Sequence, residues 1–273
     1  MREENINQIV SKLLSGEGTL SFSSLKQFKN SPKDFIDYKL KEKKQTPAMI
    51  YGSMVHCLVL EPSEFESRYH ALDDADICAQ IGGTKPRATT KYKDWKEVAL
   101  LEAGDRILVE TDDYNNAKAV AYNVIENRAS HKVLKIADQR EYDVEWTFEN
   151  FKFKGRIDGI GKNAIFDLKT CADAENTKFQ RDIISMGYYL QAAMYRVAVA
   201  EPLPYYIIAV DKVGGVSVHQ LDENLLEYGL LEYSNLLTKF NECILSESFN
   251  KSYDFWSPRY DGIFSVDKPS RFY

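Results

Sequence analysis

Two neighbouring segments in the middle of the chain alternate between apolar and polar positions. Residues 141–148 and 151–157 each place an apolar residue or glycine at every second position, which is typical of strands with one buried face. The two-residue turn Glu149-Asn150 predicts that the two strands pair as a hairpin. Residues 164–168 are an apolar run short enough for a buried strand, joined to the second strand by the turn at 159–163. We therefore expect three consecutive strands here.

Helical patterns flank these strands on both sides. Ser21 is a suitable N-cap, and Pro32 suits the first turn of a second helix. Residues 48–60 are apolar almost all round, which predicts a buried helix, and Gly52 in its middle indicates close contact with a neighbour. Further helices are expected at 92–103, 112–128 (capped by Thr111), 178–200 and 222–246, with a loop at 73–90 and a strand hairpin at 205–220.

These elements predict an α/β protein, and 273 residues is an ordinary length for one domain of that class. We expect a single domain over residues 1–273 with three parts. Residues 1–136 are mainly helical, residues 137–220 form the sheet core, and residues 221–273 form a long helix followed by an aromatic tail.

Composition excludes several classes of protein. The four cysteines are scattered without a C-x-x-C pair, so neither a zinc site nor a disulfide framework is expected, and a reducing cytoplasm fits best. The chain has no signal-peptide pattern and no apolar run of membrane-spanning length. It also lacks a glycine loop that could cradle phosphates, so we expect no ATP hydrolysis.

The net charge of −6 is unevenly distributed. Residues 25–44 contain seven lysines against three acids, and residues 85–96 form a second basic stretch. Residues 201–250 contain eight acids against two lysines. Such segregation can create a basic groove on an acidic protein, although solvated helix faces explain the charges equally well.

The candidate chemistry lies on the predicted strands. Asp167 and Lys169 project from the same face of one strand, and the hairpin can bring Asp158 close to Asp167. Two carboxylates beside a lysine suit a hard divalent cation such as Mg²⁺, and the lysine would orient or deprotonate the attacking water. The alternative is a surface hairpin with a solvated ion pair. His56 is either a core histidine or a further ligand, and Glu145 is either a ligand or a solvated carboxylate.

Four short motifs, in this order, resemble the PD-(D/E)xK nuclease superfamily in its RecB-like branch. They are Gly52-x-x-x-His56, Gly155-Arg156-x-Asp158, Asp167-x-Lys169-Thr170 and Gln191-x-x-x-Tyr195. Residues 52–62 look more narrowly like the RecE (exonuclease VIII) C-terminal nuclease and its phage relatives. The resemblance implies a restriction-endonuclease-like core, in which a central mixed sheet is flanked by helices.

The resemblance also implies roles for particular residues. His56, Asp158, Asp167 and the backbone carbonyl of Leu168 would bind one or two Mg²⁺ or Mn²⁺ ions. Lys169 would assist the water nucleophile, with Gln191 in support. Candidate DNA contacts are Ser23, Lys26, Lys85, Arg87, Lys91, Tyr188 and Tyr195. An iron–sulfur cluster is not expected, because Ser31 stands where cluster-binding members have a cysteine and no late cysteine group follows.

The activity implied is degradation of linear double-stranded DNA from its 5′ ends in phage-type recombination. RecE-like enzymes work as ring-shaped oligomers, so a trimer or tetramer and a single-strand annealing partner are expected. Two alternatives stay open. One is a structure-specific or single-strand DNA endonuclease. The other is a non-catalytic DNA-binding scaffold for recombination.

Overall fold

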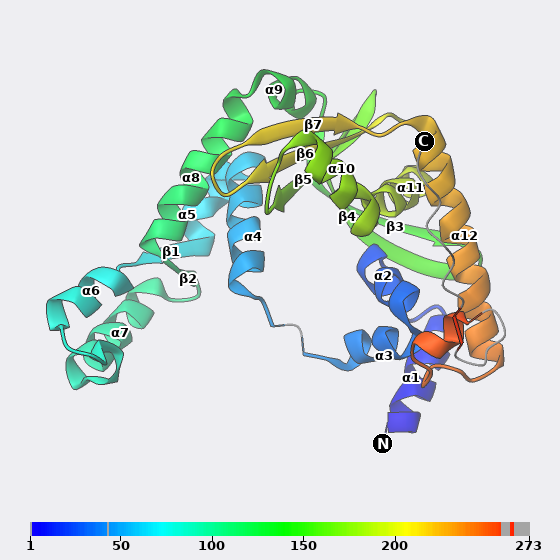
Figure 1. Ribbon diagram of the computed structural model, residues 1–273, viewed down its shortest axis with the longest axis horizontal. Helices are drawn as coiled ribbons and strands as arrows, with labels where there is room; N and C mark the ends of the chain where they lie inside the picture. The colour runs from blue at the N-terminus through cyan, green and yellow to red at the C-terminus, as the bar shows by residue number, and fades with distance from the viewer. Residues whose placement is uncertain (1, 43, 258–262, 265–273) are drawn as a thin grey trace.

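A five-stranded mixed sheet lies at the centre of the protein (Figure 1). The structure is a computed structural model that describes residues 2–42, 44–257 and 263–264. The strands lie in the order β3 (Gln139–Phe148), β4 (Phe151–Gly161), β5 (Ala164–Cys171), β6 (Tyr205–Asp211) and β7 (Val216–Gln220). Neighbours are antiparallel except β5 and β6, which are parallel. The predicted α/β class with a central mixed sheet is confirmed.

Helices cover both faces of the sheet. Their bounds are α1 (Arg2–Leu14), α2 (Phe22–Asn30), α3 (Pro32–Leu40), α4 (Pro47–Leu60), α5 (Phe65–Arg68), α6 (Asp74–Ile81), α7 (Thr90–Ala103), α8 (Thr111–Glu126), α9 (Arg128–Leu134), α10 (Asn176–Ser185), α11 (Tyr188–Val199) and α12 (Glu223–Leu245). Within the described ranges, no helix is both long and apolar enough to cross a membrane.

Two hydrophobic clusters divide the core between the faces of the sheet. One contains residues of α1, α2, α3, α10, α11 and α12 packed on apolar side chains of β3, β4, β5 and β6. The other contains residues of α4, α8 and α9 packed on β5 and β6. The two faces of β5 show the alternation clearly, because Ile165 belongs to the first cluster while Phe166 and Leu168 belong to the second. The sheet is therefore buried on both sides, and α4 and α11 reach β5 from opposite faces.

Most predicted elements form where their local signals place them. Ser21 caps α2 in a reciprocal capping box with Ser24, and Asp222 caps α12. The helix expected at 178–200 is interrupted at Gly187, whose φ of +72° separates α10 from α11. Thr111 begins α8 instead of capping it.

The loop expected at 73–90 contains α6 and a short 3₁₀ turn. It is part of an arm in which α6 and α7 extend away from the central sheet, beyond a small parallel sheet of β1 (Tyr69–Leu72) and β2 (Ile107–Glu110) (Figure 1). The arm is ordered by a polar cluster, since the buried Asp74 carboxylate pairs with Arg87 and accepts the hydroxyl of Tyr92. Of the predicted aromatic tail, residues 258–262 and 265–273 lie outside the described residues.

Candidate functional site

Strands β4 and β5 part at the two aspartates of the second and third motifs. Their backbone pairing runs from Gly161–Ala164 to Gly159–Phe166 and stops there, although the next pair in register is Asp158 with Asp167. At this point the Asp158 side chain enters the gap, and its Oδ2 accepts the backbone N–H of Leu168 at 2.7 Å. The separation of the strands gives two buried carboxylates room to face a common ligand.

Lys169 and Gln191 fix the position of Asp167. Lys169 Nζ lies 2.6 Å from Asp167 Oδ2, and the side-chain Nε2 of Gln191 donates to Asp167 Oδ1 at 3.3 Å. Gln191 comes from α11, below the same face of β5, and its Nε2 also donates to the hydroxyl of Tyr195 at 3.3 Å. The Asp167 carboxylate is therefore held on both oxygens.

His56 reaches the site from α4. Its Nδ1 lies 3.6 Å from Asp158 Oδ2. Gly52, one turn earlier on the same helix, faces Thr170 of β5 so closely that an added Cβ would lie 2.9 Å from Thr170 Oγ1. The absence of a side chain at position 52 therefore lets α4 approach β5 and carries the imidazole to the carboxylates.

The glutamate nearest to this group is Glu141, which the sequence reasoning missed. One ligand atom each from His56, Glu141 and Asp158 lie within 4.8 Å of one another. The candidate from the sequence, Glu145, is exposed, and its backbone pairs with Lys154, four residues along β3 from Glu141. The hairpin register explains the difference, since Arg140 and Tyr142 pair with Gly159 and Ile157 and leave Glu141 opposite Asp158.

Burial and crowding of like charges shape the electrostatics of the site. The pKa of Asp158 is raised, first by burial and then by the charge of Asp167. The pKa of Glu141 is also raised, by burial and by Asp158. Burial and then Lys169 lower the pKa of His56, which favours the neutral imidazole. Burial alone would lower the pKa of Lys169, but the charges of Asp167 and Asp158 outweigh it and raise that pKa.

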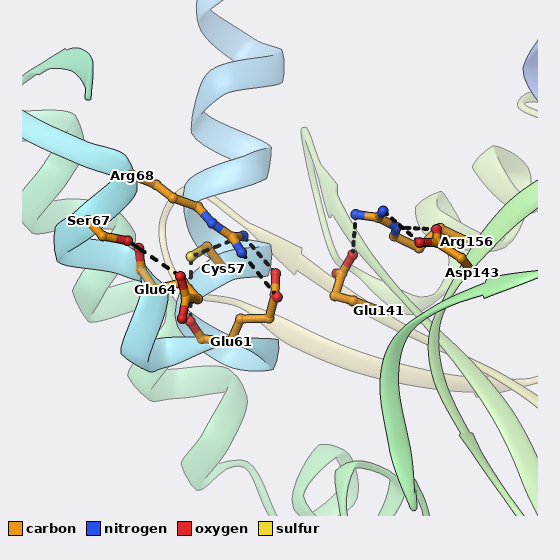
Figure 2. Close-up of polar contacts among 8 residues, drawn as sticks. All are labelled: Cys57, Glu61, Glu64, Ser67, Arg68, Glu141, Asp143 and Arg156. Carbon is orange, nitrogen blue, oxygen red and sulfur yellow. Dashed lines mark hydrogen bonds and ion pairs between the residues drawn. The ribbon is translucent and has the colours of Figure 1, made fainter. Parts of the chain in front are cut away.

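Two arginines stand on the walls of the pocket that contains these groups. The pocket has a volume of about 710 Å³, and its lining includes His56, Asp158, Lys169, Arg68 and Arg156. Figure 2 shows the two guanidinium groups on opposite sides of a gap, one from α5 and one from β4. Both guanidinium groups are substantially exposed, so each can contact a ligand that enters the pocket.

Carboxylates hold both arginines in place. Arg68 donates to both oxygens of Glu61 at 2.7 and 3.1 Å, and Arg156 donates to both oxygens of Asp143 at 2.7 and 3.0 Å. Neither arginine was named as a site residue from the sequence. The position of Arg156 two residues before Asp158, on the same face of a strand, was the signal that could have identified it.

The candidate DNA contacts on α2 and α11 differ in their accessibility. Ser23 is exposed, and Lys26 lies close enough to the site that burial, followed by repulsion from Lys169, lowers its pKa. The ring centroid of Tyr188 lies 4.9 Å from Lys169 Nζ. Tyr195 is buried, and its hydroxyl donates to the backbone carbonyl of Arg156 at 2.8 Å. Tyr195 therefore supports β4, and a contact between Tyr195 and DNA stays a prediction.

Some of the basic residues expected to line a groove for DNA are exposed, whereas others are already paired with carboxylates. Lys85 and Lys91 are exposed on the arm, but Arg87 is paired with Asp74, its Nε lying 3.0 Å from the carboxylate. In the lysine-rich segment 25–44, Lys29 forms an ion pair with Glu232 at 2.6 Å. Lysines of this segment thus also serve to join helices, which the local charge count did not indicate.

The donor set fits a hard divalent cation. Such ions take carboxylate oxygens, accept an imidazole and keep positions open for water and substrate. Asp158, Glu141 and His56 offer these donors at the wall of the pocket, and the buried Asp167 lies behind them beside Lys169. The backbone of Leu168 is hydrogen-bonded to Asp158 and adjacent to His56. His56 is neutral in its favoured state, as metal binding requires.

Comparison with known proteins places the chain in a family. The family model described as "PDDEXK-like domain of unknown function (DUF3799)" matches residues 21–252. The chain belongs to this family. The predicted membership of the PD-(D/E)xK superfamily is thereby confirmed, while the narrower likeness to RecE stays a prediction. Comparison with curated proteins gives no match.

One solved structure shares the fold of this chain. A crystal structure described as "Putative exonuclease" from Eubacterium rectale matches with a TM-score of 0.57 and 17% identity, over 94% of this chain and 92% of that chain. At this identity the likeness establishes the fold alone. The crystal structure of SSO0001 is 18% identical over 68% of this chain and 85% of its own, and its TM-score of 0.26 carries no argument.

Proposed function

We propose that this PDDEXK-like protein is a divalent-metal-dependent deoxyribonuclease that degrades linear double-stranded DNA from its ends. The observation that carries the proposal is the pair Asp158 and Asp167 on two strands that part beside Lys169, with His56 reaching the same point from α4. A purely structural role gives no reason to bury two facing carboxylates, when burial and then the charge of Asp167 raise the pKa of Asp158.

The residues of the site would have different roles in phosphodiester hydrolysis. Mg²⁺ or Mn²⁺, held by His56, Asp158, Asp167 and the carbonyl of Leu168, would supply a Lewis acid and a bound water of lowered pKa. Lys169 keeps its proton because its pKa is raised, so it acts as a charged donor that orients the water and the phosphate. It is less suited to remove a proton from the water.

Positive groups around the pocket support a polyanionic substrate. Arg68, Arg156 and Lys169 all line the pocket, and Lys26 of α2 lies close enough to Lys169 to be repelled by it. These groups can contact phosphates without reading base sequence. Such binding weakens with salt, because each phosphate contact releases counterions.

The resemblance to RecE-like enzymes supports the finer parts of the proposal. These are 5′ to 3′ polarity, a ring-like trimer or tetramer, and a single-strand annealing partner in phage-type recombination. The four free cysteines fit a reducing cytoplasm. Mass measurement in solution tests the oligomer, and duplexes labelled at either end test the polarity.

The decisive assay compares a linear duplex with a covalently closed circle in Mg²⁺. We expect the wild type to degrade the linear duplex and leave the circle intact. Asp167→Ala and Lys169→Ala should lose activity, the latter by roughly 100- to 1,000-fold, as expected when one preorganised charged donor is removed. Glu145→Gln is the matched control, because its carboxylate is exposed on β3 away from the site.

Each other result has a defined meaning. Cleavage of the circle would support the endonuclease alternative. DNA binding without divalent-dependent cleavage would support the scaffold alternative. Equal activity of the wild type, Asp167→Ala and Lys169→Ala would refute the assignment of the site.

A further inference from the structure

We infer that Tyr188 is a positioning residue for Lys169, and that the face of its ring holds the Lys169 ammonium in place beside Asp167. The inference rests on the proposed nuclease, in which Lys169 orients the water and the phosphate. It adds a residue on which that reaction depends. It also gives Tyr188 a role other than the direct contact with DNA that the sequence led us to expect.

The ammonium of Lys169 contacts both a carboxylate and an aromatic ring. Its Nζ lies 2.6 Å from Asp167 Oδ2 and also lies over the ring of Tyr188, 4.9 Å from the ring centroid. An ammonium within about 6 Å of a ring centroid is attracted by the negative face of the ring, and more strongly where water is excluded. The Lys169 side chain is only 19% exposed, so the attraction to Tyr188 is screened little by solvent.

Asp167 alone is an incomplete anchor for this ammonium. A lysine carries its charge at the end of a flexible four-carbon stem, so one contact leaves it freedom to move. Asp167 is also a proposed metal ligand, and a carboxylate that shares its charge with a cation attracts an ammonium less. Lys26 of α2 lies near enough to repel Lys169. The ring of Tyr188 is an attractive contact that does not depend on what Asp167 binds.

One turn of α11 supports both polar residues of β5. Tyr188 and Gln191 lie three residues apart, so they share a face of the helix. Gln191 Nε2 donates to Asp167 Oδ1 at 3.3 Å, while Tyr188 lies against Lys169, two residues farther along the strand. The positive φ of Gly187 separates α11 from the preceding helix, so that α11 begins at Tyr188.

The ring of Tyr188 is itself held by packing. Phe179 of α10 is fully buried, and its ring is stacked on that of Tyr188 with centroids 6.1 Å apart and planes 27° from parallel. On β7, the buried His219 places its ring 5.1 Å from that of Phe179. A ring fixed in this way can restrict the position of an ammonium, which a freely rotating side chain could not do.

Single-turnover cleavage of a linear duplex in Mg²⁺ tests the inference, because it separates the rate at saturation from the affinity for DNA. Tyr188→Leu keeps apolar bulk but removes the ring, so the saturating rate should fall about 2- to 30-fold, the range that loss of a cation–π contact spans. The affinity for DNA should not change. Tyr188→Phe keeps the ring and should recover most of the rate. Tyr122→Leu, the same change on the exposed surface of α8, is the matched control.

A double-mutant cycle shows whether Tyr188 acts through Lys169. When Lys169→Ala has already removed the ammonium, adding Tyr188→Leu should slow cleavage no further. A residue that only stabilises the fold would lower the rate by the same factor in both backgrounds. Equal factors would therefore overturn the inference, as would a Tyr188→Leu variant that loses affinity for DNA but keeps the saturating rate.

NMR of the metal-free protein with ¹³C-labelled lysine gives a measurement that does not depend on activity. Protons over the face of a ring are shielded, so the terminal CH₂ of Lys169, assigned by its absence in Lys169→Ala, should resonate at unusually low frequency. The shielding should persist in Tyr188→Phe and disappear in Tyr188→Leu. Its absence from the wild type would overturn the inference.

Failure of the inference can be distinguished from failure of the proposed function. A wild type that cleaves no DNA in Mg²⁺ would refute the function, and with it any role of Tyr188 in the reaction. A wild type that cleaves DNA, with a Tyr188→Leu variant that is equally fast, would overturn the inference alone.

Discussion

The carboxylate of Asp158 accepts the backbone N–H of Leu168 at 2.7 Å, where the ladder between β4 and β5 ends. The side chain thereby replaces the carbonyl that a regular antiparallel pair would supply. The Asp158 carboxylate therefore has a structural role, as acceptor of the Leu168 N–H, and a proposed chemical role, as a ligand of the cation. Substitutions that remove one role and keep the other are informative.

Asp158→Asn should keep the hydrogen bond to Leu168 and lose the binding of the cation. An amide oxygen can still accept the N–H of Leu168, but it lacks the charge that a divalent ion needs, so nuclease activity should fall at least about 100-fold. Burial and the charge of Asp167 raise the pKa of the wild-type carboxyl, so the fold favours the protonated form. The stability that this protonated carboxyl contributes is lost as the pH rises through the raised pKa. The metal-free Asn variant at pH 8 should therefore unfold at a higher temperature than the metal-free wild type.

Asp158→Ala is the matched comparison. It removes the same charge but leaves the buried N–H of Leu168 without its acceptor, which costs about 1–3 kcal/mol. Thermal unfolding in EDTA at pH 8 should rank the Ala variant below the Asn variant. Equal stability of the two variants would show that water or backbone movement satisfies Leu168.

The raised pKa of Asp158 predicts a steep pH dependence of metal binding. The cation must displace a proton wherever Asp158 is protonated, so its apparent affinity falls by about tenfold for each pH unit below the pKa. An ordinary aspartate, with a pKa of about 3.9, would give no change near neutrality. His56 adds little, because its lowered pKa leaves it mostly neutral.

Mn²⁺ titrations at pH 6, 7 and 8 measure this effect. We expect the dissociation constant to increase as the pH falls, with proton release detected by repeating the titration in buffers of different ionisation enthalpy. A dissociation constant that stays constant from pH 6 to pH 8 would contradict the raised pKa of Asp158.

The hairpin turns explain how much of the site could be predicted from the sequence. The turn at Glu149-Asn150 pairs Phe148 with Phe151, and counting seven residues outward from each reaches Glu141 and Asp158. The alternation of apolar and polar residues alone could not show which of Glu141 and Glu145 lies beside Asp158, because both lie on the same face of the strand. The register could have been counted from the predicted turn, so Glu141 was within reach of sequence reasoning.

Other features depend on contacts that no local pattern contains. Arg87 pairs with Asp74 and Lys29 with Glu232, so charges that look free along the chain are already paired in the fold. The break at Gly187 has a similar origin. Apolar spacing continues through it, and the turn of the chain is set by how α10 and α11 pack on β5 and β6. Tertiary packing therefore determines where this helix is interrupted and which of these charges are paired.

Substitutions of Lys26 and Tyr195 should change the salt dependence of DNA binding differently. Lys26 has a lowered pKa from burial and from repulsion by Lys169, so Lys26→Gln should not reduce the stability of the fold. If Lys26 contacts a phosphate, its removal should reduce the slope of log binding constant against log salt by about 1. Tyr195→Phe should leave that slope unchanged and lower the free energy of unfolding by about 0.5–1.5 kcal/mol, because it removes the hydrogen bond to Arg156.

Fluorescence-anisotropy titrations of a labelled duplex in Ca²⁺, over a range of salt concentrations, provide the measurement. Lys132→Gln, on the exposed surface of α9, is a control for the loss of one charge. A salt slope that changes in Tyr195→Phe but not in Lys26→Gln would reverse the assignment of the two residues.

The contact between Gly52 and Thr170 predicts a rescue experiment. In Gly52→Ala the new Cβ would lie 2.9 Å from Thr170 Oγ1, so α4 must move away from β5 and take His56 with it. Mn²⁺ affinity should fall by several-fold to about tenfold. Alanine also favours the helix by about 0.8–1 kcal/mol, so thermal stability alone cannot report the effect of the contact.

Thr170→Ala removes the atom that the new methyl group meets. The double variant Gly52→Ala/Thr170→Ala should therefore recover most of the Mn²⁺ affinity, while Thr170→Ala alone should bind Mn²⁺ nearly as well as the wild type. The recovery depends on geometry, because neither substitution changes a charge or a ligand. If the double variant binds Mn²⁺ as weakly as Gly52→Ala, then contact with Thr170 is not what sets the distance between α4 and β5.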